Sequence, residues 1–289
     1  MSLPRRTVEL IGVPSGIGAQ DPGCADGPLV LRRLHAFRDG RAVWDGMLRP
    51  REGAQSALEA DAELCMRVAE RVQQTLAAGR FPLVVGGDHS CAIGMWSGVF
   101  QWLNARGPLG LIWLDAHMDS HTFATTPSGA LHGMPLACLL GYGEPALTAI
   151  GGAGAKLQPE HVCLLGVRSY ESGEAALLHR LGVRVITMGE IRERGARAAV
   201  NEALQIARTG TAGYGLSLDL DVLDPAEGPG VGSPVPGGIL CDELAQALHL
   251  LHNDPALLGM EIVEYNPLRD PERQTAQAAD RLFRAVMQD

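Results

Sequence analysis

The stretch LGLIWLDAHMDSH, residues 109–121, contains the most informative pattern in the chain. Its apolar run, 109–114, has the length and composition of a strand buried on both faces. Asp115, His117 and Asp119 follow at alternate positions, so an extended backbone would place all three side chains on one side. Aspartate and histidine are common metal ligands. The stretch therefore predicts a buried strand that ends in a metal-binding segment.

Further candidate ligands follow two other apolar runs. Asp219 and Asp221 stand in GLSLDLDVLDP (215–225), and His89 stands in GGDHS (86–90). Four aspartates at one sheet edge would repel one another without a counter-charge. Two divalent ions would supply it, at a spacing of about 3.5–4 Å that suits shared carboxylates. A ligand set rich in oxygen favours manganese over zinc or copper.

Short apolar runs alternate with longer amphipathic ones along the chain, which predicts an α/β fold with a mostly parallel sheet and helices on both faces. We expect one domain over 1–289. The glycine- and proline-rich segment 225–238 is expected to be a long active-site loop. Candidate strands lie at 7–13, 42–48, 82–87, 109–115, 162–167, 183–187, 213–219 and 258–264, and candidate helices near 28–37, 56–78, 90–104, 173–181, 196–208, 241–252 and 271–287.

Polar clusters follow five of these strands. In open α/β sheets, ligands bind beyond the carboxyl ends of the strands. We therefore expect an active-site rim there. The clusters are 86–90, 115–121, 168–174, 219–224 and 264–266.

The composition of the chain argues against several classes of partner and of site. The chain has 24 basic and 33 acidic residues, a net charge of −9, which argues against nucleic acid and against an anionic membrane surface. No CxxC pair occurs among the six cysteines, so neither a thiolate zinc site nor a redox motif is predicted. Without a signal-like segment or a long apolar span, the expected location is the cytoplasm.

Four motifs together resemble the ureohydrolase family, the binuclear manganese amidinohydrolases that include arginase and agmatinase. They are GGDHS (86–90), DAHMD (115–119), SLDLDVLDP (217–225) and EIVEYNP (261–267). The resemblance implies a three-layer α/β/α domain with an eight-stranded, mostly parallel sheet. It also implies two Mn²⁺ per chain, a small guanidino substrate, and assembly as a homotrimer or homohexamer.

Carried over by position, the resemblance implies two ligand sets. His89, Asp115, Asp119 and Asp219 would hold one ion, and His117, Asp115, Asp219 and Asp221 the other. A hydroxide shared by the two ions would attack the guanidinium carbon, with Asp119 accepting a hydrogen bond that orients it.

The segment HTFATTPSGALHGMP (121–135) is similar to the arginase version of this loop. That similarity makes His132 the expected proton shuttle, a role that suits a side chain titrating near neutral pH. Glu264 would contact the guanidinium through a charge-assisted hydrogen bond. The expected reaction converts L-arginine, or a related guanidino compound, to urea and an amine.

The residues expected to bind the tail of the substrate depart from the arginase pattern. Arginases usually bind the substrate carboxylate through an asparagine, a serine and a second asparagine, where this chain has His121, Ser128 and Ala130. Glu171 replaces the aspartate that usually helps with the α-amino group. The alternative substrates are therefore guanidinobutyrate, guanidinopropionate and agmatine.

Three other functions would need different sequence features. A metallophosphoesterase would typically add an asparagine followed by histidine, and no asparagine here is followed by one. A deacetylase of a related fold would use one zinc and a His-His pair, which is also absent from the sequence. A non-catalytic family member would be expected to have lost a metal ligand, but all six candidates are present.

Overall fold

The chain folds around one eight-stranded sheet, seen in a computed structural model that describes residues 6–38 and 42–287. All neighbouring strands pair in parallel, in the order β2-β1-β3-β8-β7-β4-β5-β6. The strands are β1 (Val8–Val13), β2 (Ala42–Met47), β3 (Phe81–Gly86), β4 (Leu109–Leu114), β5 (Val162–Val167), β6 (Arg184–Thr187), β7 (Gly213–Asp219) and β8 (Leu257–Val263). The predicted α/β class, the eight strands and the parallel sheet are confirmed.

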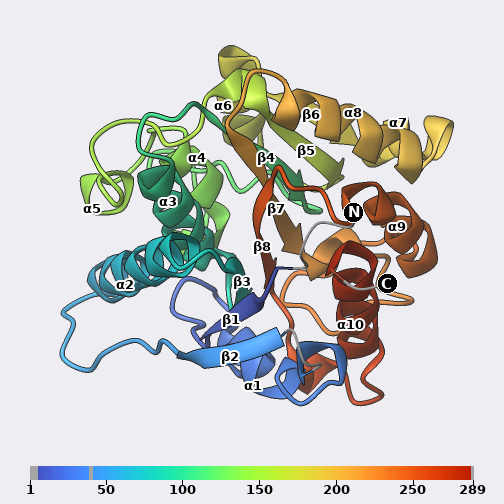
Figure 1. Ribbon diagram of the computed structural model, residues 1–289, viewed down its shortest axis with the longest axis horizontal. Coiled ribbons are helices and arrows are strands. Elements are labelled where there is room, and N and C mark those ends of the chain that lie inside the picture. The colour runs from blue at the N-terminus through green and yellow to red at the C-terminus, as the bar shows by residue number, and fades with distance from the viewer. Residues whose placement is uncertain (1–5, 39–41, 288–289) are drawn as a thin grey trace.

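Helices cover both faces of the sheet, which gives three layers (Figure 1). One face packs against α2 (Ala57–Ala77), α3 (Ala92–Leu103), α4 (Pro135–Leu139) and α6 (Ser172–Leu181). The other packs against α1 (Gly27–Leu31), α8 (Ala196–Arg208), α9 (Cys241–Leu248) and α10 (Gln274–Met287). The remaining helices are α5 (Pro145–Thr148) and α7 (Met188–Arg194).

Strand β4 shows why the strands of this sheet are continuous apolar runs in the sequence. Leu111 and Trp113 belong to the core under α2 and α3, whereas Ile112 and Leu114 belong to the core under α8 and α9. Side chains alternate between faces along a strand, so a strand covered on both sides must be apolar at every position. Its burial pattern confirms this, with all six residues buried.

The helix predictions were right for the long elements and wrong in detail elsewhere. The helix expected over 28–37 ends at Leu31, and a separate 3-10 turn spans Ala36–Arg38. Three short helices, α4, α5 and α7, were missed, because four to seven residues are too few to show a helical period. All six cysteines are free and buried, as expected of reduced core residues.

The sheet order places a switch point at its centre. Strands β3 and β4 follow each other along the chain but are separated in the sheet by β8 and β7. Ligands of open α/β sheets bind where the strand order reverses, beyond the carboxyl ends. None of the helices in the described part of the chain is long and apolar enough to cross a bilayer.

Candidate active site

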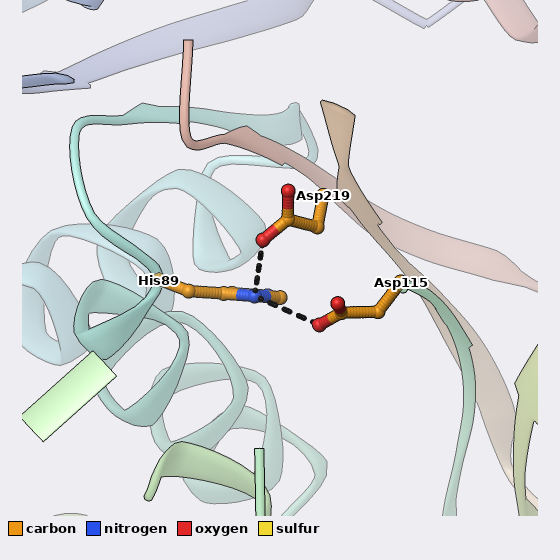
Figure 2. Close-up of side chains that lie close together, drawn as sticks. All are labelled: His89, Asp115 and Asp219. Atoms are coloured by element: carbon orange, nitrogen blue, oxygen red, sulfur yellow. Dashed lines mark ion pairs between the residues drawn. The ribbon is translucent and has the colours of Figure 1, made fainter. Parts of the chain in front are cut away.

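Three of the predicted ligands meet beyond the carboxyl ends of β3, β4 and β7 (Figure 2). His89 begins a 3-10 turn after β3, Asp115 directly follows β4, and Asp219 is the last residue of β7. His89 Nδ1 lies 3.4 Å from Asp115 Oδ2 and 3.1 Å from Asp219 Oδ2. Their potential ligand atoms all lie within 4.8 Å of one another.

The orientation of the His89 ring in this first cluster is fixed by contacts on the side away from the carboxylates. His89 Nε2 contacts Ser217 Oγ at 2.9 Å, and the ring stacks on Trp113 with centroids 4.3 Å apart. Nδ1 then faces the carboxylates, with Asp119 Oδ2 at 3.0 Å as the third. Although it is fully buried, Nδ1 has no hydrogen-bond partner among residues 6–38 and 42–287. A buried, unpartnered nitrogen aimed at three carboxylate oxygens fits a bound cation better than a proton.

A second cluster shares Asp115 with the first. His117 Nδ1 lies 3.4 Å from Asp115 Oδ1 and 2.9 Å from Asp221 Oδ2, and these three residues form another set whose ligand atoms lie within 4.8 Å. The other Asp221 oxygen accepts a hydrogen bond from Ala116 N at 3.0 Å. Two adjacent clusters joined by one carboxylate can hold two cations.

The extended backbone that would place Asp115, His117 and Asp119 on one side does not reach residue 119. Strand β4 ends at Leu114, and the backbone of Asp115 makes one more hydrogen bond to the neighbouring strand, from its N to Leu165 O. Asp119 has φ +47°, in the left-handed region. Non-glycine residues rarely adopt it, and such strain concentrates at functional sites. The three side chains therefore reach the site from the loop after β4, and not from a continuing strand.

Buried carboxylates dominate the electrostatics of the site. Burial, followed by the neighbouring charge of Asp115, raises the pKa of Asp119 to about 7. Burial, followed by the charges of nearby aspartates, also raises the pKa of Asp219. The protein alone therefore does not keep all of these carboxylates ionised, and added positive charge would. The donor set fits divalent cations on this ground as well.

His132 and Glu264 form an ion pair beside the metal clusters. His132 Nδ1 lies 2.9 Å from Glu264 Oε1, which also accepts a hydrogen bond from His89 N at 2.9 Å. Burial alone would lower the pKa of His132, but the hydrogen bond with Glu264 raises it to about 9. Glu264 directly follows β8 with φ +65°. At neutral pH His132 is thus a cation that can give up a proton.

A cavity of about 250 Å³ opens over these groups. It is lined by residues from the loops after β1, β4, β5, β7 and β8. Four of the five predicted polar clusters therefore reach one rim, whereas the cluster 86–90, after β3, does not line the cavity. The lining residues are Gln20, His117, Asp119, His121, Pro127, Ser128, His132, Gly133, Glu171, Glu174, Asp219, Asp221, Ser233 and Glu264. Ser233 belongs to the segment predicted as an active-site loop.

Only some of the residues predicted to contact the substrate tail line the cavity. His121, Ser128 and Glu171 line the cavity, whereas Ala130 does not and only donates its backbone N to Ser128 Oγ at 3.2 Å. Sequence reasoning assigned no role to Glu174, which lies in the polar cluster 168–174. The sequence carried a signal for it, because an acidic residue three positions into a helix is a typical N-terminal cap.

The sequence and the fold are each similar to those of known proteins. A sequence model described as the arginase family matches residues 6–288. The arginase of Bacillus caldovelox is 41% identical over 95% of both chains, and that of Brevibacillus brevis is 40% identical over 98% of both. The solved structure of the Bacillus caldovelox arginase superposes with a TM-score of 0.92 at 38% identity, covering 98% of this chain and 99% of that one.

Proposed function

Because the chain belongs to the arginase family and is thus an amidinohydrolase, we propose that it hydrolyses the guanidinium group of L-arginine, or of a related guanidino compound, to urea and an amine. The observation that carries the proposal is the pair of His/Asp clusters sharing Asp115 beneath a cavity that also contains His132 and Glu264. In the reaction, water adds to the guanidinium carbon and the C–N bond to the tail breaks. The leaving amine then takes a proton.

We propose two Mn²⁺ per chain as the cofactor, held by the six residues His89, Asp115, His117, Asp119, Asp219 and Asp221. Four carboxylates and two imidazoles form a hard, oxygen-rich donor set, which suits manganese. When bound, such ions lower the pKa of a coordinated water towards neutrality and polarise the substrate. Asp115 belongs to both clusters, so it would help to hold both ions.

The remaining groups supply orientation and proton transfer. The Asp119 carboxylate lines the cavity and can accept a hydrogen bond that orients the attacking water. The substrate guanidinium is a cation, and Glu264 offers it a buried carboxylate. To His132, whose Nδ1 lies 2.9 Å from Glu264 Oε1, we assign the protonation of the leaving amine as a general acid.

A direct test measures urea release from L-arginine by the purified chain with no added metal and after loading with Mn²⁺, Zn²⁺ or Co²⁺. We expect activity with Mn²⁺ and about two Mn²⁺ per chain by elemental analysis. The matched control is Asp221→Asn, purified in the same way, which should lose most activity. Absence of urea from every guanidino compound, in protein shown to hold two Mn²⁺, contradicts the proposal.

We propose further that residues 1–289 form one domain, that the chain assembles as a homotrimer or homohexamer, and that it works in the cytoplasm. The family match over 6–288 and the single continuous sheet support the first point. Assembly and location rest on the family resemblance and on composition. Light scattering after size-exclusion chromatography tests the assembly, and cell fractionation tests the location.

A further inference from the structure

A second cavity lies apart from the proposed active site. It has a volume of about 380 Å³ and is lined by Leu29, Arg32, Arg33 and Arg38, none of which lines the active-site cavity. Arg32 and Arg33 directly follow α1, and Arg38 ends a 3-10 turn that packs against β2 and α10 (Figure 1). Three cationic side chains from one short stretch of the chain therefore surround one cavity.

These three guanidinium groups have no carboxylate partner. Within residues 6–38 and 42–287, none of them lies within 4.0 Å of a carboxylate oxygen. Asp280 of α10 reaches the same turn, but both of its oxygens are engaged: Oδ1 accepts from Ala36 N at 2.9 Å, and Oδ2 accepts from Arg284 Nε at 2.8 Å. Like charges gathered at one site repel one another unless a counter-charge is present. The described part of the chain supplies no such counter-charge here, so a bound anion would.

One of the three side chains is held in place before any ligand arrives. The guanidinium carbon of Arg32 lies 5.9 Å from the centroid of the Trp44 ring, and Trp44 Nε1 donates to Phe37 O at 2.7 Å. Stacking on an anchored ring restricts the Arg32 side chain. The entropy lost when that side chain binds a ligand is therefore reduced.

The chemistry of the lining groups indicates a phosphate. A guanidinium presents a planar set of N–H donors that binds two phosphate oxygens at once, and a monocarboxylate would neutralise only one of the three charges. The cavity, at about 380 Å³, is within the usual size of small-ligand sites, about 300–1,000 Å³. A nucleic acid is disfavoured because the chain has a net charge of −9, which would repel a long polyanion. The ligand that fits is therefore a small anion with a phosphate group.

We propose that Arg32, Arg33 and Arg38 form a binding site for the phosphate group of a small molecule, either the free ion or a phosphate monoester. Contacts with the phosphoryl oxygens are common to both. The site shares no residue with the groups assigned to guanidinium hydrolysis, so it is independent of the proposed function.

Calorimetric titration of the Mn²⁺-loaded chain, freed of unbound metal and kept at constant ionic strength, tests the site with inorganic phosphate and with adenosine 5′-monophosphate. Because Mn²⁺ itself attracts phosphate, tryptophan emission is followed in parallel. We expect a saturable change in emission that Trp44→Phe removes while the calorimetric binding remains, since Arg32 lies over that ring. An affinity for the monoester at least about threefold above that for the free ion assigns an organic phosphate, and any smaller ratio assigns the free ion.

Variants assign the binding to the cluster. Arg33→Gln and Arg38→Gln each remove a charge-assisted contact, so each should weaken phosphate binding by about tenfold. Arg197→Gln, which changes an exposed arginine on α8, alters the net charge equally and is the matched control. It should stay within about twofold of the wild type, because a distant surface charge contributes little. All three substituted side chains are exposed, so the core is unchanged.

Three results would overturn the proposal. Arg33→Gln could bind phosphate as the wild type does, or neither could bind it up to about 20 mM. Arg33→Gln and Arg197→Gln could lose affinity equally, which would show attraction by overall charge and not by a site. Calorimetric binding without any change in Trp44 emission would place the phosphate elsewhere. Urea release enters none of these measurements, so failure of the amidinohydrolase assignment would be seen separately.

Discussion

Asp61 is a buried acid whose ionisation should make folding stability depend on pH. It lies on α2, is 0% exposed, and accepts a hydrogen bond from Ser90 Oγ at 2.7 Å. The same hydroxyl also contacts Asp88 Oδ1, and Asp61 Oδ2 has no hydrogen-bond partner in the described part of the chain. One hydroxyl proton cannot satisfy two carboxylates. Burial, followed by the charge of Asp88, raises the pKa of Asp61 to about 7.

The magnitude follows from proton linkage. An aspartate in the unfolded chain has a pKa of about 3.9, so the folded state binds the Asp61 proton more tightly. Stability is therefore lost as pH rises from the unfolded value towards the folded one, at about 1.4 kcal/mol per pH unit. Between pH 5.5 and the folded pKa near 7, the penalty grows by about 2 kcal/mol. Asp61→Asn removes this titration.

The assay is urea-induced unfolding of the wild type and Asp61→Asn at half-unit steps from pH 5.5 to 8.5, with free energies from linear extrapolation. We expect the stability of the variant relative to the wild type to increase by about 2 kcal/mol across that range, whatever its offset at pH 5.5. Glu70→Gln, an exposed acid on the same helix, is the control and should give a flat difference. A flat difference for Asp61→Asn would refute the reasoning.

Three further predictions concern the site. His132→Gln should lower kcat by about 10²–10⁴ while the Mn²⁺ content stays unchanged, because it removes a general acid but no proposed ligand; loss of metal would contradict this. Asp115→Asn should lower the content of both ions together, since Asp115 belongs to both clusters; elemental analysis showing one ion fully retained would argue against the shared carboxylate. Arg168→Lys should weaken Mn²⁺ binding by about 10- to 100-fold, because lysine cannot reproduce the planar set of hydrogen bonds that holds the Asp221 backbone. A Mn²⁺ titration that gives the wild-type affinity for this variant would contradict the prediction.

Much of the fold was predictable because the sheet is covered on both faces. A run such as 109–114 has to be apolar throughout when alternate residues enter two different cores, and this makes the strand visible in the sequence. The short helix Pro135–Leu139 has no such signal. Its position depends on packing against α3, which a local pattern does not contain.

The chemical groups of the site were also readable from the chain. Asp115, His117 and Asp119 were identified by type and spacing, and the structure brings Asp115 and His117 to Asp221, 104 and more positions away along the chain. The extended backbone on which their shared direction depended is not present, because β4 stops at Leu114 and Asp119 adopts a left-handed backbone. Local spacing identifies the ligand types, whereas the turn that aims them depends on contacts made across the sheet.

By itself, the sequence determined the class of fold, the strand-end positions of the acidic and histidine residues, and the family. Only the tertiary structure decided which partners the polar side chains of the cavity have. In the sequence, His121 is an open choice between a donor and a cation. In the structure its two ring nitrogens are taken by Thr125 and Glu171, which come from different loops. A hydrogen bond between segments 50 positions apart is set by how the loops pack, so the partners of His121 are known only once the chain is folded.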